Sequence, residues 1–149
     1  MQCLAKRGAQ VTGELPAALE AEYAAIFAYG PIGVKLTGGE QTAARAAEAA
    51  HRTLRDALVV ALQGTGLPPA RAAYALPEPI VDRASALRVA IVVEEKAAAV
   101  WRAALPATVD TQRRQALDAL TGCAVRATRW RRYAKVDPIT VAFPGKAPA

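Results

Sequence analysis

Apolar residues recur along the chain at intervals of three, four and seven, and this spacing predicts amphipathic helices. The first predicted helix covers about residues 14–36, with an apolar stripe at Leu15, Leu19, Ile26 and Gly33. Pro16 would fall in its first turn, where a missing N–H does no harm. We expect Gly30-Pro31 to kink the helix, because proline removes one backbone hydrogen bond.

The same periodicity predicts three further helices over about residues 40–63, 82–105 and 108–135. Asp82 is a plausible N-cap of the third helix. Between the second and third helices, four prolines interrupt residues 64–81 (Pro68, Pro69, Pro77 and Pro79). Proline at this density argues against a helix, and the length of the segment favours a long crossover along a bundle. Residues 139–145 are predicted to be an extended tail packed on the helices.

Composition supports this all-α interpretation and a single domain. Of 149 residues, 53% are hydrophobic but only 5% are aromatic, and the difference is mostly alanine, a strong helix former with a small side chain. We therefore expect closely packed helices: a flexible N-terminal arm over residues 1–13 and one four-helix bundle domain over residues 14–145. Arrays of exposed alanine could also serve self-association, so we expect a homodimer.

The cysteines and the hydropathy profile predict a cytoplasmic protein. Cys3 and Cys123 lie far apart, without metal-type spacing, and are interpreted as reduced thiols. No apolar run approaches the ~20 residues that span a bilayer, so no membrane span is expected.

Three polar residues stand on otherwise apolar stripes. They are Glu22 on the first predicted helix, His51, which is the only histidine, on the second, and Glu94 on the third. A buried carboxylate is costly unless a metal or a hydrogen-bond donor compensates it. The fourth predicted helix has no carboxylate on its inward row, which is Ala116, Leu120, Cys123, Ala127 and Trp130.

Two interpretations of these residues stay open. The first is a site for one metal ion at Glu22, His51 and Glu94; Glu48 stands three residues before His51, on the same helical face, so both side chains could reach one ion. The second is a hydrogen-bonded cluster in which His51 bridges the two carboxylates, completed by a side chain from the set Tyr23, Tyr29, Arg52 and Arg55. Two carboxylates beside one imidazole would favour the protonated form of His51.

A set of short motifs also carries a family resemblance. They are Glu20-Ala21-Glu22-Tyr23-Ala24-Ala25 leading to Ala28-Tyr29-Gly30, His51-Arg52 with Arg55-Asp56, Tyr74-Ala75-Leu76-Pro77, Trp101-Arg102, Ala127-Thr128-Arg129-Trp130, and Pro138-Ile139-Thr140 through Ala142-Phe143-Pro144-Gly145. Through these motifs, taken in this order, the chain resembles the ferritin-like superfamily, and specifically its small alanine-rich actinobacterial family of unknown function. The resemblance implies a ferritin-like four-helix bundle.

The resemblance also implies ligands for iron or manganese at Glu22, Glu48, His51 and Glu94, but the second half of such a site is missing. Ferritin-like carboxylate bundles take a Glu-x-x-His pair from each of two helices. Glu48 and His51 form one such pair, whereas the nearest candidate on the fourth helix is Asp118 with Thr121, which has no imidazole. With one histidine the full two-metal site cannot be built, so competent di-iron chemistry is not expected.

Three functional hypotheses follow, and the sequence leaves open whether the protein is an enzyme. The leading one is a binding or structural module with a degenerate site. The alternative is a metal-binding oxidoreductase or metal-storage-like protein that uses iron or manganese. The third is nucleic-acid or anionic-surface binding through the basic run on the fourth helix, which is Arg126, Arg129, Arg131, Arg132 and Lys135. No recognition motif accompanies this run, and cations are favoured in the last turns of a helix anyway, so nucleic acid is the less favoured partner.

Overall fold

The protein was described from a computed structural model. It describes the backbone of residues 5–65, 67 and 69–147, and side chains within these ranges from residue 13 onward. Cys3 and the first four residues of the predicted arm lie outside the described residues.

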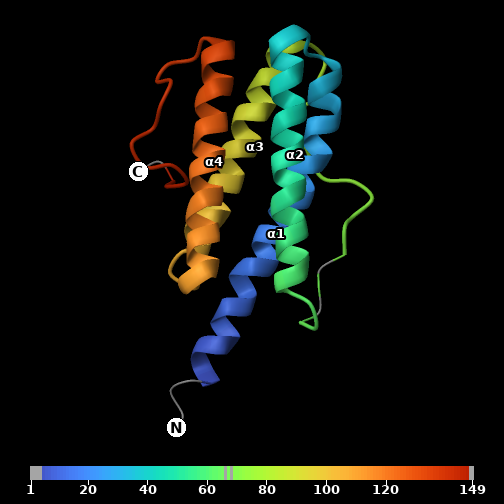
Figure 1. Ribbon diagram of the computed structural model, residues 1–149. Helices are drawn as coiled ribbons and strands as arrows, with labels where there is room; N and C mark the ends of the chain where they lie inside the picture. The colour runs from blue at the N-terminus through green and yellow to red at the C-terminus, as the bar shows by residue number, and fades with distance from the viewer. Residues whose placement is uncertain (1–4, 66, 68, 148–149) are drawn as a thin grey trace.

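Four helices form the structure: α1 (Ala5–Val34), α2 (Gly38–Ala61), α3 (Arg83–Ala104) and α4 (Asp110–Ala134). The described residues contain no β-strand. In Figure 1, α2 and α3 run in the same direction, and the connection between them passes along the length of the bundle. The predicted all-α bundle with a long crossover is therefore confirmed. Within the described part of the chain, no helix is long and apolar enough to cross a membrane.

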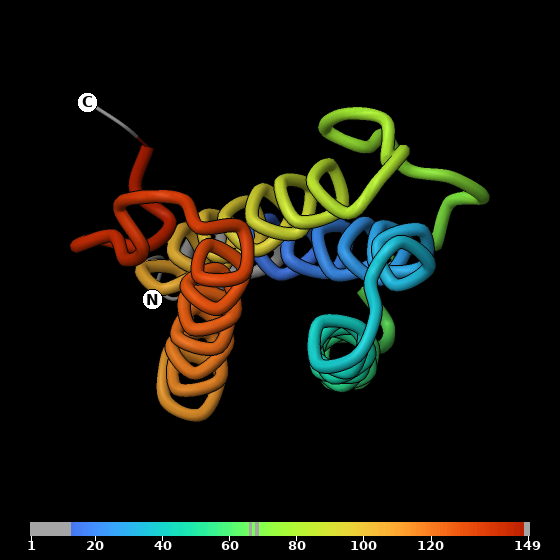
Figure 2. The backbone as a smooth tube through the Cα atoms, turned by 90° about the horizontal axis from the view of Figure 1, so that it is seen from above, coloured from blue at the N-terminus to red at the C-terminus, as the bar shows by residue number. Residues whose placement is uncertain are grey.

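The helices are not packed evenly around a closed ring. Seen from above in Figure 2, α1 and α3 lie side by side in the middle, with α2 next to α1 and α4 next to α3. The helices α2 and α4 approach each other only slightly. The core is therefore formed mainly at three interfaces: α1 with α2, α1 with α3, and α3 with α4.

Two of the predicted helix boundaries differ from the structure. Helix α1 begins at Ala5, well before the predicted start near Glu14, so Pro16 lies inside the helix rather than in its first turn. From Ala5 onward the predicted arm over residues 1–13 therefore overlaps α1, and its flexibility stays a prediction. Despite Gly8 and Gly13, a helix before Glu14 is favoured by Ala5, Lys6, Arg7, Ala9 and Gln10. At the other end, α1 continues through Pro31 to Val34.

The start of α3 and the tail follow the prediction. Asp82 caps α3 because its carboxylate accepts a hydrogen bond from the Ser85 N–H at 2.8 Å. The Ser85 hydroxyl oxygen in turn accepts one from the Asp82 N–H. Two N–H donors at the helix end are thereby satisfied. The tail lies along the bundle, where Arg102 Nη1 donates to the Pro144 carbonyl at 3.3 Å.

The hydrophobic core consists of two clusters, one toward each end of the bundle. One includes Ile32, Leu87 and Trp130, and the other includes Leu19, Leu58 and Trp101. On each of α1, α2 and α3, a stretch near the middle separates the residues of the two clusters. That middle level is where the three candidate polar residues stand.

Candidate functional site

The three inward polar residues are brought together at the middle of the bundle. Glu22 on α1, His51 on α2 and Glu94 on α3 are each wholly buried. Their burial follows from their register, because each stands on the face that its helix turns toward the core. The prediction that all three face inward is confirmed.

His51 lies between the two carboxylates and contacts both. Its Nδ1 is 2.6 Å from Glu22 Oε2, and its Nε2 is 3.3 Å from Glu94 Oε1. Burial lowers the pKa of His51, but the hydrogen bonds and charges of Glu22 and Glu94 outweigh burial and raise this pKa to about 9. The imidazole is therefore a cation at neutral pH, with one N–H donated toward each carboxylate.

Aromatic donors give each carboxylate one more hydrogen bond. Trp101 Nε1 donates to Glu22 Oε1 at 2.6 Å, and the Tyr29 hydroxyl donates to Glu94 Oε1 at 2.5 Å. Trp130 Nε1 in turn donates to the Tyr29 oxygen at 2.8 Å. Burial and the neighbouring Glu94 charge raise the pKa of Tyr29 well above its usual value, so the phenol stays a donor.

The fourth helix contributes Arg126, which sequence reasoning did not place here. Its Nε donates to Glu94 Oε1 at 2.9 Å, and its Nη2 lies 3.2 Å from the Cys123 sulfur. Burial raises the pKa of Glu94, but hydrogen bonding to His51 and the charges of His51 and Arg126 outweigh it, so this pKa is lowered. Two carboxylates thus face one imidazolium and one guanidinium, and the formal charges cancel.

We call this set of side chains the polar layer. Its members are Glu22, Tyr29, His51, Glu94, Trp101, Arg126 and Trp130. One atom of the polar layer lacks a partner within the described part of the chain: Glu94 Oε2 is buried and accepts no hydrogen bond there. Cys123 borders the layer as a buried thiol whose pKa is raised by burial, so it is an inert packing thiol.

The remaining candidates lie outside the polar layer. Glu48 accepts a hydrogen bond from Arg52 Nη2 at 2.5 Å on the outer side of α2, which is the ion-pair role typical of i, i+4 residues. Arg55 pairs with Asp56 instead of the cluster. Among the four side chains proposed to complete the cluster, Tyr29 does so, and no polar contact joins Tyr23 to it among the described residues.

The geometry of His51 decides how this set could meet a metal ion. Its two ring nitrogens point in opposite directions, so Glu22 and Glu94 lie on opposite edges of the ring, and an ion bound at one nitrogen would be reached by one of the two carboxylates. Among the described side chains, no three of the His, Cys, Asp and Glu type converge on a common point in a way that could hold a metal ion. Arg126 also places a fixed positive charge beside Glu94. In this arrangement the residues do not fit a two-metal centre.

The basic run of α4 is divided between inward and outward positions. Arg126 contacts Glu94 and Arg131 contacts Glu95, so both are held by α3. The exposed members are Arg129, Arg132 and Lys135. The surface available to phosphates is thus smaller than the sequence run suggests, and binding of nucleic acid stays a prediction.

Two signals could have identified the missed members of the polar layer. An indole N–H on a buried stripe needs an acceptor, so Trp101 and Trp130 could have been paired with the inward acids. Arg126 follows Cys123 by one helical turn and precedes Trp130 by another, which places it at the edge of the inward row. From the sequence, Trp130 was placed on the inward row and Arg126 in the basic run, and neither was paired with an acid.

Comparisons with known proteins place this fold in a family. A family model described as "Domain of unknown function (DUF4439)" matches residues 14–148. A crystal structure of a conserved hypothetical protein, rv2844, from Mycobacterium tuberculosis is 36% identical, with a TM-score of 0.82 over 93% of this chain and 99% of that chain. A comparison with curated proteins found no match. The chain belongs to the family of DUF4439 proteins.

Proposed function

We propose that this protein is a ferritin-like bundle that acts as a binding or structural module, without competent di-iron chemistry. The observation that carries the proposal is the position of His51 between Glu22 and Glu94, with one ring nitrogen toward each. The His51 imidazolium and the Arg126 guanidinium thereby occupy the positions beside the carboxylates that metal ions would need.

The polar layer fits the role of a tie between helices. Its contacts connect α1 to α2, α1 to α3, and α3 to α4. Buried polar groups with several partners hold one arrangement of a core in place, because any other arrangement leaves charges without partners. In an alanine-rich core, whose small side chains specify the relative position of helices weakly, such a tie gives the bundle a defined register.

Elemental analysis tests this proposal. The full chain is purified without chelator, and iron and manganese are measured per chain. We expect far less than one ion per chain, with no difference between the wild type and His51→Ala. One or two ions per chain that are lost in His51→Ala would overturn the proposal; Glu48→Ala is the matched control, because Glu48 lies outside the polar layer.

A second candidate is a single iron or manganese ion held by Glu22, His51 and Glu94. One observation favours it: Glu94 Oε2 is buried without a partner, as a carboxylate oxygen would be if its partner were a ligand. Binding would require His51 to lose its proton and the Arg126 guanidinium to withdraw from Glu94. Metal content that is lost in both Glu94→Gln and His51→Ala, and retained in Glu48→Ala, would support this candidate against the first.

The homodimer and the cytoplasmic location expected from the sequence remain proposals. Light scattering of the full chain measures the first directly: twice the chain mass at micromolar concentration supports a dimer, and the mass of one chain contradicts it.

A further inference from the structure

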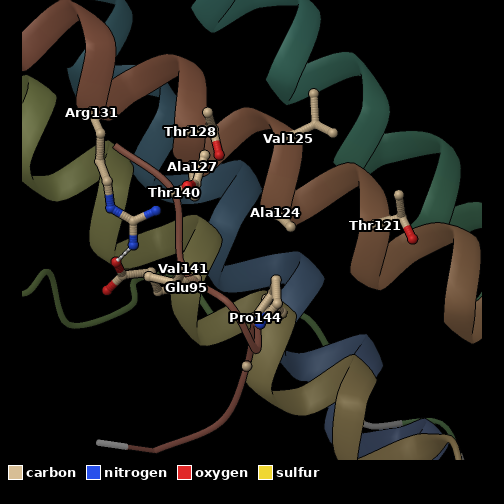
Figure 3. A pocket seen from close by; sticks show the side chains of 12 residues that line it. Glu95, Thr121, Ala124, Val125, Ala127, Thr128, Arg131, Thr140, Val141 and Pro144 are labelled. Atoms are coloured by element: carbon tan, nitrogen blue, oxygen red, sulfur yellow. Dashed lines mark hydrogen bonds and ion pairs between the residues drawn. The ribbon is translucent and has the colours of Figure 1, made fainter. Parts of the chain in front are cut away.

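A second site stands out between α3, α4 and the tail, and it shares no residue with the polar layer. It is a pocket of about 270 Å³ whose wall includes Glu95 of α3, Arg131 of α4 and the tail segment 140–145. Figure 3 shows the Arg131–Glu95 pair at one end of the pocket and Thr121 at the other. We call it the tail pocket.

The charged end of the tail pocket contains a buried arginine with donors to spare. Arg131 is only 6% exposed. One Nη nitrogen of its guanidinium donates to Glu95 Oε1, and Glu95 is the one acceptor that its side chain contacts among the described residues. Arginine carries five N–H donors, so most of them are free. None of these nitrogens is both buried and unpartnered, so the free donors reach accessible space.

The rest of the tail pocket is mostly apolar and made of small side chains, with hydroxyl groups from Thr121, Thr128 and Thr140. Ala98 of α3, Ala124 and Ala127 of α4, and Val141 and Pro144 of the tail line it. At about 270 Å³ the tail pocket lies just below the usual range for drug-sized ligands, so it has room for a small organic molecule. One cationic end and an aliphatic body match a ligand with one anionic end and a short aliphatic chain.

The tail wall of the pocket is held in a fixed position. Gly145 has φ +74, and a Cβ added there would lie 2.5 Å from the Ala98 carbonyl oxygen, so only glycine allows the tail this close to α3. Arg102 also donates to the Pro144 carbonyl at 3.3 Å. The pocket is thus a feature of the packed tail and not of a loose chain end.

We propose that the tail pocket binds short aliphatic carboxylates, with Arg131 as the anion-binding residue. The ligand carboxylate accepts hydrogen bonds from the free donors of Arg131, and its alkyl group packs against the alanines and Pro144. Glu95 is a competitor, because its carboxylate holds the same guanidinium. Its side chain is 47% exposed, so it can turn toward water when a ligand enters.

This inference goes beyond the proposed function by naming a ligand class for a binding module. The two proposals are tested separately, because metal content reports only on the polar layer and ligand binding reports on the tail pocket.

The test is an NMR titration of the full chain with isobutyrate and, as an uncharged counterpart, isobutyramide. We expect saturable shifts of the Thr128 and Val141 amides with isobutyrate, and at least about tenfold weaker binding of isobutyramide, because hydrogen bonds to charged groups are the stronger ones. Absence of saturable shifts, or equal affinity for the two probes, would overturn the proposal.

Substitutions at the charged end should change isobutyrate affinity in opposite directions, which a purely structural role of these residues would not produce. Arg131→Met should weaken isobutyrate binding at least about tenfold, while Glu95→Gln should strengthen it about threefold or more, since the competing charge is removed. The matched control Arg132→Met, at an exposed neighbour of Arg131 on α4, should leave affinity unchanged. Weaker binding in Glu95→Gln would contradict the proposal even if Arg131→Met fails to fold.

A fourth variant tests the wall without touching the charged end. In Gly145→Val the new side chain cannot coexist with the Ala98 carbonyl, so the tail must move away from α3. We expect at least about tenfold weaker isobutyrate binding with unchanged helix content by circular dichroism. Unchanged affinity in a folded Gly145→Val protein would show that the ligand binds elsewhere.

Discussion

Two carboxylate–arginine pairs join α3 to α4, and they differ in burial and in surroundings although their chemical groups are the same. Glu94 and Arg126 meet in the polar layer, where Glu94 is wholly buried. Glu95 and Arg131 meet at the tail pocket, where Glu95 is about half exposed. The acids are neighbours in the sequence, but a step of about 100° around the helix sends one into the core and the other to its edge.

This difference decides what each pair can do. In the polar layer, Glu94 Oε1 is shared by Tyr29, His51 and Arg126, so removal of one partner leaves charges that water cannot reach. At the tail pocket, water can replace either partner of the Glu95–Arg131 pair. The first pair is therefore a structural contact, and the second leaves an arginine that can exchange its partner.

The largest effect is expected from removal of the imidazolium. His51→Leu leaves Glu22 and Glu94 buried without the cation between them, and loss of one partner from a buried ionic network costs ~3–5 kcal/mol. Urea unfolding followed by circular dichroism measures the change. The neighbour Arg52, exposed on the same helix, provides the control: Arg52→Leu should change the free energy of unfolding by less than ~0.5 kcal/mol. Equal effects of the two substitutions would contradict the polar layer as a structural tie.

The stability of the wild type should fall as pH rises from about 6.5 to 8. The pKa of His51 is about 9 in the folded protein and ~6.5 in an unfolded chain. Because the folded value is the higher one, its contribution is fully present below pH 6.5 and is lost as the pH approaches 9. Across this window the loss is at most ~1.4 kcal/mol per pH unit.

Two features limit the contribution of other titrating groups to this pH dependence. His51 is the only histidine of the chain, and the free thiols of the unfolded chain ionise mainly above pH ~8. Urea unfolding at several pH values on the wild type and on His51→Gln separates the contributions. A wild type whose stability does not change between pH 6.5 and 8 would contradict the charged imidazole.

The two arginines offer the most direct comparison of the two regions. Arg126→Met leaves Glu94 without its guanidinium in a buried site, and we expect a loss of ~2–4 kcal/mol. Arg131→Met removes a cation whose partner is half exposed, and we expect ~0–1 kcal/mol. Methionine keeps part of the alkyl packing in both variants. Chemical unfolding of the pair in parallel reports the difference, and losses of equal size would remove the distinction drawn between the two pairs.

The smallest effect concerns a neutral hydrogen bond in the polar layer. Trp130→Phe keeps an aromatic ring in the core but removes the N–H that donates to the Tyr29 hydroxyl. We expect a loss of ~1–2 kcal/mol, from the hydrogen bond and the smaller ring together. Thermal unfolding measures it, with Tyr133→Phe at the partly buried neighbour as the milder reference.

The sequence by itself determined the four helices, their order and the long crossover, because period, caps and prolines are local signals. It also determined that Glu22, His51 and Glu94 face the interior, since the register of a side chain on a helix follows from spacing alone. The start of α1 was misjudged, because helix formers can extend a helix beyond the stretch whose pattern demands it.

Only the tertiary structure decided what these residues meet. Spacing says which face a side chain occupies, but not which side chain of another helix lies opposite. The placement of His51 between two acids depends on how α2 and α3 pack against α1. The inward turn of Arg126 and the free donors of Arg131 depend on how α4 packs against α3. The tail pocket depends further on Gly145, whose contact with Ala98 joins residues distant in sequence. Pairings of this kind are fixed by packing, because the cost of burying a charge is set by its neighbours in space and not by those along the chain.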